Sequence, residues 1–361
     1  MITNFELHDF KGHRDTRLTL GRFTALVGDN ASGKTSVLEA IELLGTLDPD
    51  PISNLRGVRN PSDLVRRGGK SVRLGADGWL RGEATRTEFE IQVPAASGRD
   101  FSAKLTASRG DKQWSAATNE YLDPEGGDLN DSSGTWDVLR LFFGTAMLYR
   151  LSAPAISGYS PVEDPGVQVD QRGANTGTVL TALKLTDDVT FERIEASLRR
   201  LVPTVERVRL KQERRRNQVV NRLRFDFRGA ANIPAHGASQ GTLVLLALLT
   251  VLHSPGRPNL VLLDDFDHTL HPRAQMELVR LIQSFLSLDE FADVQVVATT
   301  HSPYVLDEMD VADVHAFAID GDGCVRSKPL SAHPEAERSK GTLTAGQLWS
   351  LDPERAWVLK E

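Results

Sequence analysis

Two groups of residues in this chain have the types and spacing for chemistry on phosphate groups. The first is Gly28-Asp29-Asn30-Ala31-Ser32-Gly33-Lys34-Thr35, which matches the pattern G-x-x-x-x-G-K-[ST]. In such a loop the backbone N–H groups point at phosphate oxygens, the lysine adds positive charge and the threonine hydroxyl can bind Mg²⁺. The predicted nucleotide-binding residues of this region are Gly28, Asn30, Ala31, Ser32, Gly33, Lys34, Thr35 and Ser36.

The second group is a pair of adjacent acids, Asp264 and Asp265, at the end of the apolar run NLVLL. Neighbouring carboxylates repel each other unless a cation or a proton relieves them. In phosphate-loop enzymes a second buried strand ends in an Asp that holds Mg²⁺, so we predict that Asp264 and Thr35 are metal ligands. Asp265 would then lie beside the terminal phosphate and orient or deprotonate the attacking water. The alternative, that both acids cap a helix beginning near Pro272, places them too far upstream.

Two weaker signals accompany these groups. Ser239 and Gly241 stand at the start of an apolar helix pattern, where a hydroxyl and N–H groups form either a second anion site or a plain N-cap. His301 follows the apolar run VVATT and can either donate to a terminal phosphate or support the structure. The order of both signals along the chain, relative to the phosphate loop and Asp264, favours the functional interpretation.

The elements predicted around these residues form an α/β protein. Residues 2–28 predict two or three strands, the last one buried, and a helix follows the phosphate loop. The region 71–121 alternates in polarity and predicts an antiparallel meander. From about residue 241 the chain alternates helix and strand, which predicts a parallel sheet covered by helices. Further predictions are a helix running into a strand at 136–149, helices at 178–185 and 190–202, two strands within 207–227, and irregular segments at 50–70, 123–134 and 152–176.

Composition narrows the class of protein. The formal charge is −7, and the single cysteine, Cys324, excludes an internal disulfide framework, which fits a reducing compartment such as the cytoplasm. We identify no signal segment, and the longest apolar run, LVLLALLTVL, is shorter than the ~20 residues that span a bilayer. The basic stretch 207–216 could hold nucleic acid, but a solvated hairpin is the favoured interpretation.

These motifs resemble those of ABC-type ATPases, in particular the branch that contains RecF, the SMC proteins and the OLD nucleases. In that branch the acid strand reads apolar-Asp-Glu-Pro-Glu and is followed by Leu-His-Pro. The matching residues here are Asp264, Asp265, Phe266, Asp267, Leu270, His271 and Pro272. The opening FELHDFKGHRD is similar to the first strand and turn of the branch, and Ser239, Gly241 and Thr242 match its signature Leu-Ser-x-Gly-Thr-Leu. The resemblance is most specific over residues 1–45 and 236–305.

The resemblance implies a mechanism. It implies ATP and Mg²⁺ as cofactors and an ATP-dependent homodimer closed head to tail. In that dimer Ser239 and Gly241 of one copy reach the γ-phosphate held by the other. It also implies that Lys34, Asp265 and His301 are the catalytic residues.

The chain departs from the branch in three ways. Asp265 stands where Glu is usual and Phe266 replaces Pro; the shorter acid predicts slow hydrolysis, because proton transfer needs heavy-atom contact at about 3 Å. The segment AMLYRLSAPAI lacks the Gln that many ABC-type ATPases carry there. Only 60 residues follow His301, fewer than a typical domain of about 100, so we expect no nuclease domain.

We therefore expect an α/β fold with a P-loop ABC-type ATPase core, a mixed/parallel sheet, an antiparallel β subdomain and a small helical insertion. The expected division is an N-terminal ATPase lobe (1–150), a helical insertion with a β-hairpin (151–230) and a C-terminal ATPase lobe (231–361). The expected function is ATP hydrolysis that signals to a separate effector, a nuclease or toxin, in DNA repair or phage defence. Two alternatives stay open: the nucleotide-binding subunit of a membrane transporter, and a nucleotide sensor with little turnover.

Overall fold

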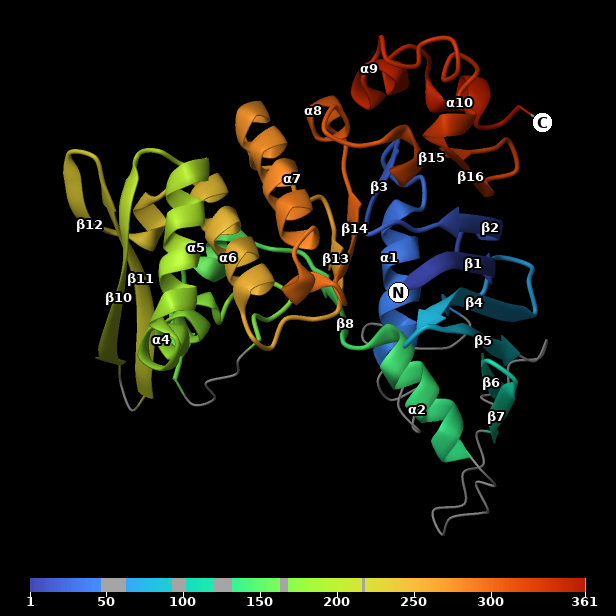
Figure 1. Ribbon diagram of the computed structural model, residues 1–361, viewed down its shortest axis with the longest axis horizontal. Coiled ribbons are helices and arrows are strands. Elements are labelled where there is room, and N and C mark those ends of the chain that lie inside the picture. The colour runs from blue at the N-terminus through green and yellow to red at the C-terminus, as the bar shows by residue number, and fades with distance from the viewer. Residues whose placement is uncertain (47–62, 93–101, 120–131, 163–167, 216–217, 361) are drawn as a thin grey trace. The chain divides into compact units, whose positions relative to one another are not determined.

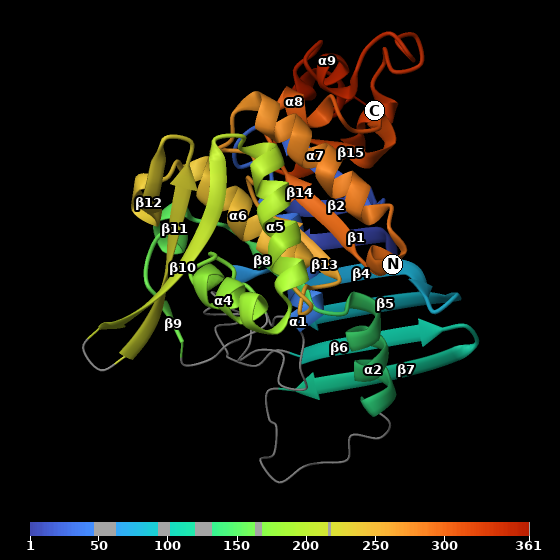
Figure 2. The same cartoon turned by 60° about the vertical axis from the view of Figure 1, so that its left-hand side comes forward.

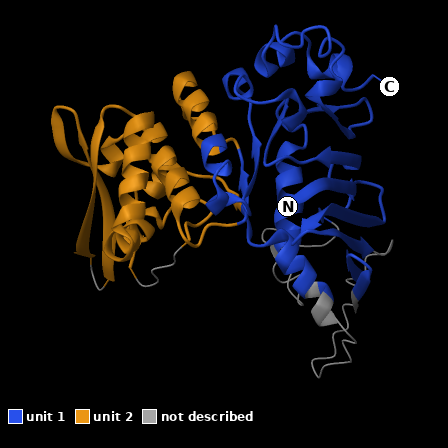
Figure 3. Ribbon diagram, in the orientation of Figure 1, with its two compact units in different colours: residues 1–147, 259–264, 283–361 blue, residues 148–258, 265–282 orange. Residues whose placement is uncertain are grey.

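The computed structural model describes residues 1–46, 63–92, 102–119, 132–162, 168–215 and 218–360. Figure 1 shows its elements. The chain forms two compact units, each assembled from separate stretches of sequence (Figure 3). Unit 1 comprises residues 1–147, 259–264 and 283–361, and unit 2 comprises residues 148–258 and 265–282. The irregular segments predicted at 50–70 and 123–134 fall largely outside the described residues.

Unit 1 is built on a twelve-stranded sheet with the order β7-β6-β5-β4-β1-β2-β16-β15-β3-β14-β13-β8. Its strands are β1 (Ile2–Phe10), β2 (His13–Thr19), β3 (Phe23–Gly28), β4 (Ser71–Leu80), β5 (Glu83–Gln92), β6 (Ser102–Arg109), β7 (Lys112–Asn119), β8 (Ala146–Tyr149), β13 (Leu260–Leu263), β14 (Gln295–Thr299), β15 (Val314–Ile319) and β16 (Val325–Pro329). Strand β8 ends in residues that belong to unit 2. Parallel and antiparallel pairs both occur, which confirms the expected mixed sheet.

The strands that lead into the chemistry-bearing motifs are parallel. Strands β13, β14, β3 and β15 run in the same direction, with Leu263 opposite Ala298 and Thr299 opposite Leu26. Every residue of β3 and β13 is buried, as is typical of strands covered on both faces. The carboxyl ends of β3, β13 and β14 therefore meet at one edge of the sheet, where ligands bind in open α/β folds.

The other half of the sheet is antiparallel. Strands β4 to β7 form the predicted meander, and β4 pairs with β1. Phe89 and Leu105 lie opposite each other on neighbouring strands, and both are buried. Helix α2 (Ser132–Phe143) packs on β6 and β7 (Figure 2). The alternation of buried and exposed positions reflects one covered face and one solvated face.

The helices after the motifs differ in length. Helix α1 (Lys34–Thr46) begins inside the phosphate loop, and α7 (Pro272–Leu286) begins in unit 2 and ends in unit 1. The helix predicted after Pro303 is the single turn α8 (Pro303–Leu306). Two further short helices, α9 (Ala345–Trp349) and α10 (Glu354–Trp357), complete the described part of unit 1.

Unit 2 is a small sheet covered by helices. Strands β10 (Val205–Arg215), β11 (Gln218–Phe227) and β12 (Ala230–Pro234) are antiparallel neighbours, and the short β9 (Ser160–Pro161) pairs with β11. Besides the first part of α7, its α-helices are α3 (Ala153–Ile156), α4 (Thr176–Thr186), α5 (Asp188–Leu201) and α6 (Gln240–His253). Helices α4 and α5 contact both this sheet and α6 (Figure 1).

The apolar run LVLLALLTVL lies in α6, whose residues 242–252 are all buried. This burial explains a helix that is apolar on every side. In the part of the chain that the structure describes, no helix combines the length and apolarity needed to cross a membrane.

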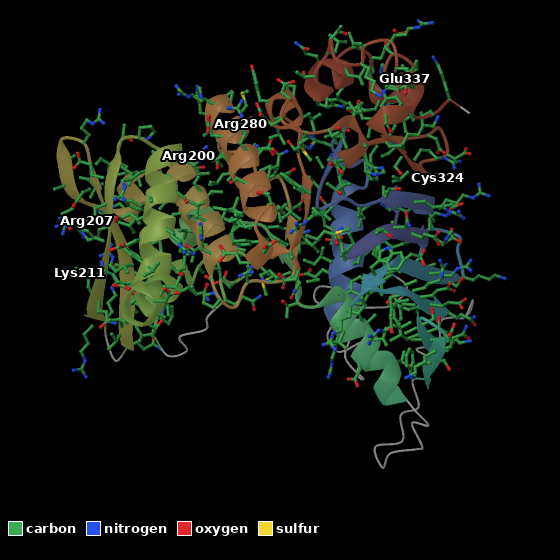
Figure 4. The ribbon with its side chains drawn as sticks, viewed as in Figure 1. Arg200, Arg207, Lys211, Arg280, Cys324 and Glu337 are labelled. Atoms are coloured by element: carbon green, nitrogen blue, oxygen red, sulfur yellow. The ribbon has the colours of Figure 1, made fainter. Side chains whose placement is uncertain are left out.

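Residues 207–227 contain the predicted pair of strands: the basic stretch lies in β10, which pairs with β11. Figure 4 labels Arg207 and Lys211 on β10. Several of its cations have acidic partners within the same sheet: Arg209 lies 2.6 Å from Asp226, and Lys211 lies 3.2 Å from Glu213. These ion pairs support the interpretation of this stretch as a solvated hairpin.

Candidate nucleotide-binding site

The phosphate loop leaves β3 in a conformation that requires glycine at two positions. Gly28 has φ +140°, and a Cβ there would lie 2.4 Å from the Phe317 carbonyl oxygen on β15. Gly33 has φ +96°, and a Cβ there would lie 2.8 Å from both His13 and Val325. No larger residue fits either place, so these glycines let the loop close tightly between the strand and α1.

Lys34 projects into this loop. Its side chain is buried, and its ammonium group donates to the carbonyl oxygens of Gly28 and Asp29, at 2.9 Å each. Ser32 is buried as well, whereas Asp29, Asn30 and Ala31 form an exposed tip. The buried cation and the N–H groups at the start of α1 give the loop the chemistry of an anion-binding site.

A carboxylate and two hydroxyls meet beside the loop. Thr35 Oγ1 donates to Asp264 Oδ1 at 2.9 Å, and Thr299 Oγ1 donates to the same oxygen at 2.8 Å. The structure therefore brings together both predicted metal ligands, which come from α1 and from the end of β13. Hydroxyl and carboxylate oxygens are the hard ligands that Mg²⁺ prefers, so the donor set fits this ion. Thr299 was not selected from the sequence, although it stands two residues before His301.

A second residue missed from the sequence, His13, holds the loop. Its ring is fully buried; Nε2 lies 3.1 Å from the Gly33 carbonyl oxygen and Nδ1 lies 2.9 Å from Thr16 Oγ1. A carbonyl can only accept, so Nε2 carries the proton and Nδ1 accepts from the hydroxyl. Burial lowers the pKa of His13 to about 4, which leaves the ring neutral near pH 7. The histidine in FKGHRD was the only sequence signal for this contact.

His301 follows β14 at the same edge of the sheet. The N–H of Thr300 donates to the Leu26 carbonyl oxygen at 3.1 Å, which ties this turn to the end of β3. Thr300 Oγ1 also accepts from the N–H of Ser302 at 3.0 Å. The side chain of His301 is exposed. His301 thus stands on a fixed backbone beside the strand that carries the phosphate loop.

The remaining predicted residues belong to unit 2. Asp265 is exposed and has φ +48°, a left-handed conformation that Asp adopts more readily than most residues. Ser239 is the N-cap of α6, and its hydroxyl accepts from the N–H of Thr242 at 3.1 Å. A Cβ on Gly241 would lie 3.0 Å from the Thr269 carbonyl oxygen, so α6 begins close against that loop. The N-cap interpretation of Ser239 is therefore confirmed, and the role of Ser239 toward a nucleotide stays a prediction.

Comparison with known proteins identifies the family. The profile described as "AAA domain, putative AbiEii toxin, Type IV TA system" matches residues 23–307, which contain the phosphate loop, Asp264 and His301. The chain belongs to this family. Its relatives place it in the RecF/SMC/OLD branch of ABC-type ATPases, as the motifs indicated.

Three curated members of this branch match part of the chain. The RecF proteins of Gloeobacter violaceus and Myxococcus xanthus are 34% identical over 93 residues and 30% identical over 148 residues, or 26% and 41% of this chain. The OLD nuclease of Thermus scotoductus is 39% identical over 66 residues, or 18% of this chain. The matches span only 23%, 36% and 12% of these three relatives, respectively.

Two solved SMC head structures share the fold. An SMC head bound to the C-winged helix domain of ScpA has a TM-score of 0.59 and 17% identity, covering 93% of this chain and 99% of that one. The Pyrococcus furiosus head, with an extended coiled coil and bound to the C-terminal domain of ScpA, has a TM-score of 0.50 and 15% identity, covering 94% and 99%. This chain thus shares the α/β fold of these two SMC heads.

Proposed function

We propose that this protein is an ATPase whose nucleotide state controls its assembly and its signal to a partner. ATP would bind the loop from Gly28 to Thr35, with Ser36 on the same helix turn. Thr35 and Asp264 would hold Mg²⁺, which, when bound, offsets phosphate charge and orients the terminal phosphate. The proposal therefore includes nucleotide binding, ATP hydrolysis and a change of assembly that a partner protein recognises.

One observation supports this proposal most strongly. Three parallel strands end together, and each is followed by a residue of the predicted site: the phosphate loop after β3, Asp264 after β13 and His301 after β14. The contact of Thr35 with Asp264 joins two segments that are more than half the chain apart in sequence. An arrangement of this kind positions a cation beside an anion-binding loop, which is what a magnesium–triphosphate complex needs.

Each side chain then has a defined task. Lys34 exchanges its carbonyl partners for phosphate oxygens, and Thr299 keeps the Asp264 carboxylate aimed at the metal position. Asp265 accepts a proton from the attacking water, and His301 donates a hydrogen bond to the terminal phosphate. Because Asp265 is one methylene shorter than the usual Glu, we expect turnover to be slow.

The output proposed is a change of assembly. Two copies close head to tail around ATP, so that Ser239 and Gly241 of each copy contact the nucleotide of the other, and hydrolysis reopens them. A separate effector, a nuclease or a toxin in DNA repair or phage defence, reads the closed state. The support is the resemblance to DNA replication and repair proteins named RecF and to an OLD nuclease, and the solved SMC heads bound to ScpA domains.

Calorimetric titration with ATP and Mg²⁺ tests the site. We expect the wild type to bind and K34A to bind roughly 10- to 100-fold more weakly, because a charge-assisted contact to phosphate is lost. Replacing Lys70 instead gives a matched control that removes a lysine outside the loop. Equal ATP affinity of wild type and folded K34A, or no binding by the folded wild type, would contradict the proposed site.

A further inference from the structure

The tip of the phosphate loop carries a negative charge. Asp29 follows Gly28 directly, and its carboxylate is exposed while its carbonyl oxygen accepts from Lys34. A carboxylate repels the phosphates that the loop is built to receive. A cation close to Asp29 would offset this repulsion and so favour binding of a polyphosphate.

Arg355 supplies such a cation from the other end of the chain. Its Nε lies 3.6 Å from Asp29 Oδ2, and the two side chains are 67% and 60% exposed. The pair is thus open to solvent, so a ligand entering the loop can reach it. Arg355 belongs to α10, in the segment after His301 for which the proposed function has no use.

Helix α10 is held firmly enough to place this arginine. Trp357 is buried, with its ring edge-on to His333 at 5.0 Å between centroids. Trp349 Nε1 donates to Glu354 Oε1 at 2.8 Å, and Lys328 Nζ donates to the Trp357 carbonyl oxygen at 3.3 Å.

The strands complete the connection between α10 and the loop. Helix α10 packs on β15, and β15 pairs with β3 so that Phe317 lies opposite Gly28. The packing of α10, β15 and β3 within unit 1 therefore places the backbone of Arg355 near Asp29, and the long arginine side chain covers the remaining distance.

We propose that Arg355 is part of the nucleotide site, where it offsets the charge of Asp29 and so sets the affinity of the loop for the polyphosphate of ATP. This inference rests on the proposed function. The alternative is an ordinary surface ion pair, which contributes little to stability. The two interpretations predict different ATP affinities. Loss of an ordinary surface pair leaves the affinity for ATP unchanged, whereas in the proposed role the affinity depends on both Arg355 and Asp29.

The experiment measures ATP·Mg²⁺ affinity by calorimetry for the wild type, R355A, D29N and the double variant D29N/R355A. We expect R355A to weaken binding about 3- to 10-fold at about 50 mM salt and much less at about 300 mM, since the effect is a screened interaction between exposed charges. D29N should bind at least as tightly as the wild type. The double variant should match D29N within about two-fold, because Arg355 then has no charge to offset.

The matched control is R338A, which removes an exposed arginine of the same segment that pairs with Glu335. Melting temperatures without nucleotide should be nearly the same for all variants, because exposed ion pairs contribute little to stability. R355A equal to the wild type at low salt would overturn the inference, as would a double variant as weak as R355A. A folded wild type that binds no ATP would overturn the proposed function and this inference together.

Discussion

At the scale of single residues, the site is held by side chains that each have at least two partners. Asp264 accepts from Thr35 and Thr299, and His13 joins the Gly33 carbonyl to the Thr16 hydroxyl. A side chain with two fixed partners keeps one orientation before the ligand arrives, which reduces the cost of ordering the site during binding.

His13 should make stability depend on pH. Its pKa is about 4 in the folded protein and 6.5 when exposed, so the unfolded chain takes up a proton that the folded chain refuses between these values. The contribution of His13 to the free energy of unfolding is fully present above pH 6.5. It falls by about 1.4 kcal/mol per pH unit as the pH is lowered toward 4. H13Q keeps a donor and an acceptor but does not titrate.

Melting temperatures of the wild type and H13Q between pH 7.5 and pH 4.5 test this expectation. The advantage of the wild type over H13Q should shrink as the pH falls, since other titrating groups cancel in the comparison. A difference that stays constant over this range would show that His13 does not resist protonation in the fold.

The sequence was sufficient to find the phosphate loop and Asp264, because each is a local pattern after an apolar run. Thr299, His13 and the pairing of Asp29 with Arg355 were not found. Each of these contacts joins residues far apart in the chain or depends on which ring nitrogen meets a carbonyl. A pattern of residue types does not say which distant residues meet, whereas strand pairing in the folded sheet fixes it.

At the scale of elements, Ser239 at the start of α6 is both the N-cap of the helix and the residue predicted to contact the nucleotide of a second copy. Ser239 satisfies the N–H of Thr242 at the start of a helix that is buried over residues 242–252. Capping alone therefore explains a serine at the start of α6. The predicted contact of Ser239 with the nucleotide of a second copy needs a test that separates it from capping.

S239D and S239A separate these roles. Asp caps a helix about as well as Ser, so S239D should melt close to the wild type, whereas S239A should lose about 1 kcal/mol of stability. If Ser239 contacts the nucleotide of a second copy, the added carboxylate should lower steady-state ATP turnover at least about tenfold. Turnover of S239D equal to that of the wild type would leave Ser239 as a cap only.

Most element types followed from the sequence, and the misses have physical causes. Strands β2 and β5 largely alternate between buried and exposed residues, and β3 is buried throughout. Helices α1, α5 and α6 have apolar residues at helical spacing or throughout. The helix after Pro303 stops after one turn, where Asp307 N–H donates back to the Pro303 carbonyl oxygen and a short loop follows. Nothing in the pattern SPYVLD marks so early an end.

At the scale of the whole molecule, the proposal makes assembly depend on ATP. D265N should trap the closed state because it removes the carboxylate proposed to activate water, so light scattering should give the mass of two chains with ATP·Mg²⁺ and of one chain with ADP. The control K34A/D265N should stay at one chain under both conditions. A D265N mass that ATP does not change would contradict the head-to-tail dimer.

The α/β class and the mixed sheet were predictable because the order of strands and helices limits the possible topologies. Which segments of the chain make up each compact unit was harder to anticipate. Unit 1 takes only residues 259–264 from the middle of the chain, and α7 passes from unit 2 into unit 1. Such a division depends on contacts between distant segments, so the lobes expected at 1–150, 151–230 and 231–361 stay a prediction.

The interrupted path of unit 1 has a consequence for biosynthesis. Strand β3 lies between β14 and β15, which begin at Gln295 and Val314. While the ribosome makes unit 2, the nascent β3 has neither neighbour, and open strand edges favour aggregation. Pairing over such sequence separation is slow, so the chain should need chaperone protection until residues 295–319 emerge.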